Sequence, residues 1–152
     1  MVKRWQRTTF NVLSALVAAT GILYFWMNDL LVSDDPLAVV NHPLQPVMLD
    51  LHILAAPLLL VIFGTVFQTH VTAKLSARTP LSRSGLTSLI TFAVMAWSGY
   101  VLQVVVNERL HLMCRWLHIG SGLVFAVSYS VHFVTGFRAW GRSFAAGDSS
   151  AR

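Results

Sequence analysis

Histidines are the residues of this chain that could do the widest range of chemistry, and four of the six lie within long apolar stretches. His52 and His70 lie in one stretch and His118 and His132 in another, whereas two further apolar stretches contain no histidine. An ionisable side chain inside a membrane-type helix is costly and marks a candidate functional site. Neutral imidazole is a good iron ligand, and axial histidines hold haem in many proteins. These four histidines are therefore the predicted axial ligands of haem iron.

Helical spacing places the histidines of each stretch on one face. His118 and His132 are 14 residues apart, about 40° short of four turns and about 21 Å along the axis. His52 and His70 are 18 residues apart, which is five turns of an α-helix and about 27 Å. Because both stretches cross the membrane in the same direction, we expect His52 to face His118 near the outer surface and His70 to face His132 near the cytoplasm. The spacings differ by about 6 Å, which helix tilt or a kink at Pro57 would absorb; otherwise only the outer pair holds haem.

Two further residues are predicted to contact the cofactor. Gly122 is small and lies one turn below the outer histidine of its stretch, where a macrocycle needs close approach, although glycine is equally common at ordinary membrane-helix contacts. Arg138 follows the inner end of the same stretch, where it sets the topology and is a candidate partner for a haem propionate. His42 and His111 lie in connecting segments, and we expect no ligand role for them.

The elements that must position these residues are membrane helices. Of the 152 residues, 55% are apolar and 11% are charged, against about 25% charged in soluble domains, which excludes an ordinary soluble enzyme. The basic residues form short clusters between apolar runs rather than a patch, which excludes a nucleic-acid partner. A single cysteine, Cys114, excludes an intramolecular disulfide and a CxxCH haem attachment.

Four stretches without Asp, Glu, Lys or Arg are each long enough to span the bilayer, over residues 8–28, 51–73, 86–107 and 116–137. The fold class is therefore all-α, a four-transmembrane-helix bundle that forms a single membrane domain over residues 1–152. The first stretch is too long for a cleavable signal and is expected to be retained. Nine of the 11 Lys and Arg residues lie in the segments on one side of the predicted spans, so both termini are expected to be cytoplasmic. The expected location is a bacterial inner membrane.

The segment LHIGSGLVFAVSYSVHFVTGFRAW, residues 117–140, resembles the haem-bearing helix of quinone-linked membrane cytochromes b. This family includes the b subunits of nickel-iron hydrogenases and formate dehydrogenases and the core of bc-type complexes, in which two histidines of one helix, spaced as His118 and His132 are, serve two stacked haems. The resemblance implies that His118 and His132 bind two b-type haems, with His52 and His70 on the partner helix, although its 18-residue spacing departs from the family pattern. It also implies electron transfer between quinone or quinol and an outer-side redox subunit, a cytochrome c or an iron–sulfur protein, within a membrane oxidoreductase complex.

Two other classes of protein remain open from the sequence. A haem-free anchor or assembly subunit would use its histidines to pair with polar groups of its neighbours. A metal or proton transporter is disfavoured, because transporters usually carry broken helices or acids at the midplane and these four stretches contain no acid.

Overall fold

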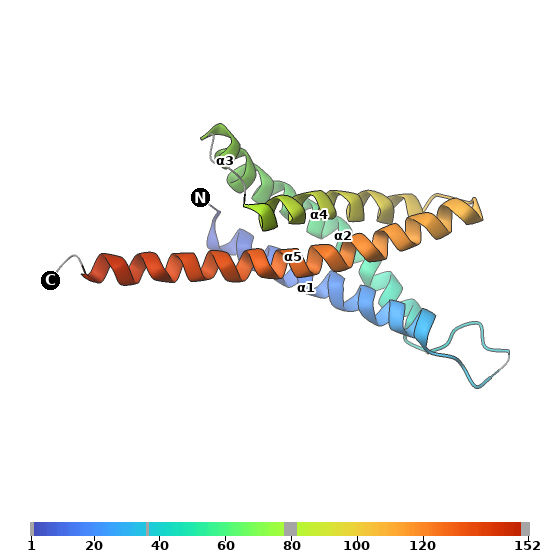
Figure 1. Ribbon diagram of the computed structural model, residues 1–152. Coiled ribbons are helices and arrows are strands. Elements are labelled where there is room, and N and C mark those ends of the chain that lie inside the picture. Colours follow the sequence, from blue (N-terminus) through green and yellow to red (C-terminus); the bar gives the residue numbers. More distant parts are fainter. Residues whose placement is uncertain (1, 36, 78–81, 150–152) are drawn as a thin grey trace. The chain divides into compact units, whose positions relative to one another are not determined.

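The computed structural model describes residues 2–35, 37–77 and 82–149, with side chains described for all of these except 75 and 137–149. All the regular secondary structure in this part of the chain is helical, as predicted, and the helices are joined by loops and turns. The elements are α1 (Arg4–Phe25), η1 (Trp26–Leu30), α2 (Gln45–Val66), η2 (Phe67–Val71), α3 (Thr72–Ser76), α4 (Arg83–Leu102) and α5 (Glu108–Ser149) (Figure 1).

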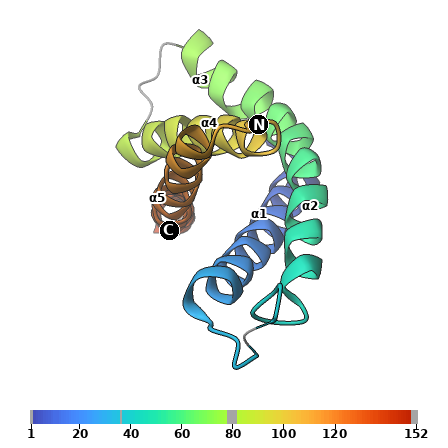
Figure 2. The same cartoon turned by 90° about the vertical axis from the view of Figure 1, so that its right-hand side faces the viewer.

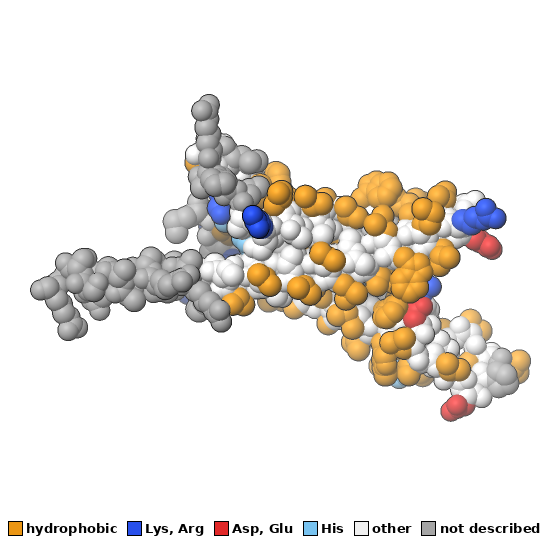
Figure 3. All heavy atoms as spheres, viewed as in Figure 1, with side chains coloured by type: hydrophobic (Ala, Val, Ile, Leu, Met, Phe, Trp, Pro, Cys, Tyr) orange, Lys and Arg blue, Asp and Glu red, His pale blue; other side chains and the backbone are white. Residues whose placement is uncertain are grey.

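Within the described residues, four helical segments are long and apolar enough to cross a membrane, which agrees with the number of predicted spans. They cover Arg4–Leu30, Gln45–Lys74, Arg83–Leu102 and Glu108–Gly136. In each segment no more than 22% of the residues in the most apolar window are buried. Along the face shown in Figure 3, apolar side chains follow the helices and charged side chains lie toward the helix ends. Surfaces of this kind are suited to lipid rather than to water.

The chain divides into two compact units, Met1–Pro80 and Leu81–Arg152, within what the sequence predicts as one membrane domain. Each unit is a helical hairpin: α1 lies along α2 in the first, and α4 lies along α5 in the second (Figure 1, Figure 2). Each hairpin therefore has a helix pair and a contact register of its own.

The first hairpin keeps one register between two widely separated contacts. The rings of Phe10 and Phe63 lie 6.2 Å apart, and at the other end the Gln45 side-chain amide donates to Asn28 Oδ1 at 3.0 Å. The sequence distance from Phe10 to Asn28 equals that from Gln45 to Phe63, so the helices pair without a slip between these two contacts.

The second hairpin is equally regular. Phe92, which is 2% exposed, packs against Phe125 with ring centroids 5.3 Å apart. One turn away, the hydroxyls of Ser88 and Ser128 lie 3.0 Å apart across the two helices. Aromatic packing and an interhelical hydrogen bond are the interactions that hold helices together where burial from water contributes little.

Helix ends differ from the predicted spans where polar residues cap them. Ser82 accepts a hydrogen bond from the Gly85 N–H at the start of α4, and Asn107 accepts one from the Leu110 N–H at the start of α5. Asn107, placed by the sequence at the end of the third span, instead caps the start of α5, and α4 ends at Leu102. The second span also begins earlier than predicted, at Gln45, with Pro46 in the first turn, where its missing N–H costs nothing.

The regular α-helix that the sequence predicts between His52 and His70 is interrupted. Residues Phe67–Val71, which include His70, form the π-helical turn η2. A π-turn accommodates one extra residue, equivalent to about 100° of α-helical rotation. The calculation that puts His52 and His70 on the same face therefore does not hold for this helix.

Candidate functional site

His52 is held against α1 by a hydrogen bond to the backbone. Its Nδ1 lies 2.9 Å from the carbonyl oxygen of Val17. Because a carbonyl oxygen can only accept, Nδ1 must carry the hydrogen and donate it. In the neutral ring the lone pair then lies on Nε2, the nitrogen that a metal would coordinate.

His118 is held in the same way in the second hairpin, where its Nδ1 lies 2.9 Å from the carbonyl oxygen of Met95 on α4. The two histidines therefore share one tautomer and a carbonyl partner at the same distance, and His52 Nδ1 also lies 3.4 Å from the Thr20 hydroxyl. Histidines that bind metals almost always donate their other ring N–H to a backbone carbonyl, a carboxylate or water, which fixes the tautomer and the ring orientation. Both residues meet this requirement.

A glycine lies beneath each of these rings. A Cβ added to Gly21 would lie 2.8 Å from His52 Cε1, and one added to Gly99 would lie 2.8 Å from His118 Cε1. Real Cβ atoms essentially never approach another heavy atom this closely. Only glycine allows the imidazole to lie against the neighbouring helix at these two positions.

His132 has a different environment at the start of α4. Its Nδ1 lies 3.3 Å from the Ser82 hydroxyl and 3.4 Å from the Ser84 hydroxyl, and a Cβ on Gly85 would lie 3.2 Å from its Cε1. A hydroxyl can donate or accept, so these contacts do not fix the tautomer as a carbonyl does. His118 and His132 lie on one face of α5, as their 14-residue spacing predicts, and both contact α4 or its N-cap residue.

His70 lies half-buried in η2, beyond the position that matches His132. His132 lies 14 residues after His118, and the residue 14 positions after His52 on α2 is Val66. The predicted pairs, His52 with His118 and His70 with His132, join residues of different units and stay predictions.

The other predicted cofactor residues have simpler surroundings. A Cβ on Gly122 would lie 3.5 Å from Met95 Sδ, an ordinary contact, so this glycine faces α4 and has room for a methyl group. The side chain of Arg138 lies outside the described residues. The Nδ1 of His42 accepts the Leu44 N–H at 3.1 Å within the connecting loop, where no ligand role was expected.

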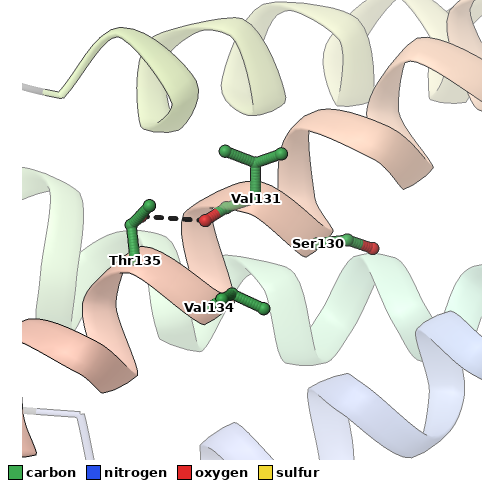
Figure 4. A pocket seen from close by; sticks show the side chains of 4 residues that line it. All are labelled: Ser130, Val131, Val134 and Thr135. Carbon is green, nitrogen blue, oxygen red and sulfur yellow. Dashed lines mark hydrogen bonds between the residues drawn. The ribbon is translucent and has the colours of Figure 1, made fainter.

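No group of three or more His, Cys, Asp or Glu residues that could hold a metal ion occurs in the part of the chain that the structure describes. Haem iron needs only one or two axial side chains, because the macrocycle supplies its other ligands. A hollow beside α5 is lined by Ser130, Val131, Val134 and Thr135, and the Thr135 hydroxyl donates to the Val131 carbonyl at 2.8 Å (Figure 4). None of these four side chains is ionisable.

Sequence reasoning from the histidines alone missed Gly21, Gly85 and Gly99. A signal was present, because the distance from Gly85 to Gly99 along the sequence equals that from His118 to His132. In an antiparallel hairpin, equal spacing on the two helices brings both pairs into register.

Comparisons with protein-family models, with curated proteins and with solved structures found no match.

Proposed function

We propose that this chain is a di-haem b-type membrane cytochrome that carries electrons across the membrane between the quinone pool and a redox partner subunit. One observation carries the proposal: His52 and His118 lie on separate hairpins, and each donates its Nδ1–H to a backbone carbonyl at 2.9 Å. This arrangement leaves two imidazoles with the lone pair on Nε2, as bis-histidine ligation requires.

Four histidines are assigned as axial ligands under this proposal. His52 and His118 hold the outer haem, and His70 and His132 hold the inner one. The outer pair has the stronger support, since each member donates to a backbone carbonyl and packs against a glycine of the neighbouring helix. The inner pair joins one histidine in a π-helical turn with another that contacts hydroxyls, so the protein binds a single haem if this pair fails.

Haem supplies the capacity to store one electron at a time. Two imidazoles of this chain would hold each iron and would leave it no position for a substrate, which favours electron transfer over chemistry on a bound molecule. The apolar helices exclude water from the ligands, and burial together with the Nδ1 hydrogen bonds tunes the potential.

The proposal includes a topology and partners. The excess of Lys and Arg on one side of the predicted spans supports cytoplasmic termini, and the proposed location is a bacterial inner membrane. The outer-side partner is a cytochrome c or an iron–sulfur subunit, and quinone or quinol would bind near the inner haem. In this proposal the protein acts as an electron-transfer subunit of a complex rather than as a stand-alone enzyme.

A second candidate is a haem-free anchor or assembly subunit, in which the same hydrogen bonds only hold the helices together. His52 bonds to α1 and His118 to α4, and interhelical hydrogen bonds stabilise membrane hairpins without any cofactor. This candidate predicts a colourless protein that tolerates single His→Ala changes.

The two candidates separate in one experiment. The protein is purified in mild detergent after expression with adequate haem supply, and its oxidised and dithionite-reduced spectra are recorded with pyridine-haemochrome quantitation. We expect two b-type haems per chain, with one lost in His118→Ala and none lost in the loop variant His42→Ala. One haem per chain would leave only the outer pair as ligands. A protein without haem would overturn the proposal and support the anchor.

A further inference from the structure

The glycine beneath each carbonyl-bonded histidine follows a buried hydroxyl residue. In α1 the pair is Thr20–Gly21, and in α4 it is Ser98–Gly99. Thr20 is 4% exposed and Ser98 is 0% exposed. The same two-residue step therefore occurs at the same place, opposite the histidine, in both hairpins.

Each hydroxyl reaches the carbonyl that the histidine uses. Thr20 Oγ1 donates to the carbonyls three and four residues earlier, at 3.1 and 2.8 Å, and Ser98 Oγ does the same at 3.1 and 2.7 Å. The carbonyl three residues earlier belongs to Val17 in α1 and to Met95 in α4, the acceptors of the histidine Nδ1–H. Back-bonding of this kind bends a helix locally, which favours a carbonyl turned outward to meet another donor.

Two glycines on the helices that carry the histidines serve as a comparison, because no neighbouring atom approaches them closely. Nothing lies within 4 Å of a Cβ added to Gly64 on α2 or to Gly120 on α5. Close contact with an imidazole is found instead at Gly21, Gly85 and Gly99, each opposite a histidine. The spacing of these glycines is thus matched to the rings and not to helix packing in general.

We infer that the Thr20–Gly21 and Ser98–Gly99 steps are positioning residues, which set the ring plane and the Nδ1–H tautomer of His52 and His118. The glycine removes the Cβ that would push the ring away, and the hydroxyl orients the carbonyl that receives the ring N–H. The inference rests on the proposed function only for the use of Nε2 by iron. The geometry itself belongs to each hairpin separately.

The tautomer is measured by NMR on full-length protein labelled with 15N-histidine, in detergent and reduced with dithionite, which leaves bis-histidine ferrous haem diamagnetic. Signals are assigned from single His→Gln variants. We expect Nδ1–H tautomers for His52 and His118, with the signal of His52 changed by Gly21→Ala and that of His118 changed by Gly99→Ala. The matched controls Gly64→Ala and Gly120→Ala add the same methyl group in open space and should leave both signals unchanged.

Binding of added hemin to haem-depleted full-length protein gives the second readout. Removing an outer partner of a metal ligand typically costs 10–100-fold in metal affinity, so we expect a loss of about this size for Gly21→Ala and Gly99→Ala and less than about twofold for the controls. Ser98→Ala adds no atom, and it tests the same positioning if Gly99→Ala fails to fold. It should shift the His118 Nδ1 signal, which Ser98→Thr should restore.

The two hypotheses fail in different ways. If Gly21→Ala and Gly99→Ala keep the wild-type tautomer signals, the positioning role is overturned whether or not hemin binds. If wild-type protein takes up no hemin, the proposed function is overturned, whatever the tautomer signals show.

Discussion

Gly85→Ala is the substitution that best tests whether the close approach of a Cβ to the histidine ring decides the effect. The alternative is that any side chain is poorly tolerated where α4 contacts α5. A Cβ at this position would lie 3.2 Å from His132 Cε1 and 2.9 Å from Ser82 Oγ. The ring of His132 has to move only slightly to reach an ordinary contact of 3.4 Å, whereas the ring of His118 over Gly99 starts from 2.8 Å and has to move further. Ser82 ends in a hydroxyl that can rotate away.

The free-energy changes at Gly85 are small and oppose each other. Rotation of Ser82 breaks its cap hydrogen bond to the Gly85 N–H, which costs about 1 kcal/mol. Replacing glycine by alanine in a helix returns up to about 1 kcal/mol. The contacts of His132 with the two hydroxyls are already long, at 3.3 and 3.4 Å, so weakening them costs about 0.7 kcal/mol at most, or about threefold in affinity.

We therefore expect the free energy of unfolding of Gly85→Ala to lie within about 1 kcal/mol of that of wild type. Its hemin affinity at the proposed inner site should fall by no more than about threefold. Unfolding in mixed detergent and a hemin titration measure the two quantities, and Ser82→Ala isolates the contribution of the cap. A loss at Gly85→Ala as large as that at Gly99→Ala would refute the steric reasoning, because the added Cβ would approach Cε1 to 3.2 Å in the first variant and to 2.8 Å in the second.

Three further outcomes are expected. His70→Ala should reduce the haem content from two per chain to one by pyridine haemochrome, and retention of both haems would remove His70 from the ligand set. Gly122→Ala should leave the hairpin as stable as wild type or up to about 1 kcal/mol more stable, because alanine is a better helix former than glycine and the added methyl meets only Met95, whose Sδ would lie 3.5 Å away; loss of haem from this folded variant would identify Gly122 as a contact of the macrocycle. A double-mutant cycle of Ser88→Ala and Ser128→Ala, whose hydroxyls lie 3.0 Å apart, should give a coupling of about 0.6 kcal/mol in unfolding experiments, and a coupling near zero would contradict a direct hydrogen bond.

Hydropathy and charge predict the helical class and the four spans because lipid demands about 20 apolar residues in each. They do not predict the helix ends, which polar caps decide. Asn107 looks like the end of one apolar stretch, yet its side chain accepts the N–H of Leu110 and begins α5. Nor does periodicity reveal η2, because a π-turn leaves the apolar pattern of the sequence intact while rotating His70.

The chemistry of the candidate site was predictable only in part. Histidine types and spacing identify His118 and His132 as residues on one face, and the structure shows both facing α4. Their hydrogen-bond partners could not be predicted in this way. The partner of His118 is a backbone carbonyl, and every residue type has one. Gly99 was open to detection by its distance from Gly85, which repeats that between the two histidines, but only a contact register between two helices gives that spacing a meaning.

Each carbonyl-bonded histidine is seated by the helix that precedes it in the chain, and this has a consequence for biogenesis. A hairpin is the smallest part of the chain that contains both an imidazole and its seat, so His52 acquires its orientation as soon as α1 and α2 pair. Freezing such a side chain costs about 0.5–1.5 kcal/mol, and this entropy is lost when the hairpin forms. The two histidines are thus oriented one hairpin at a time, in the order in which the ribosome delivers the hairpins.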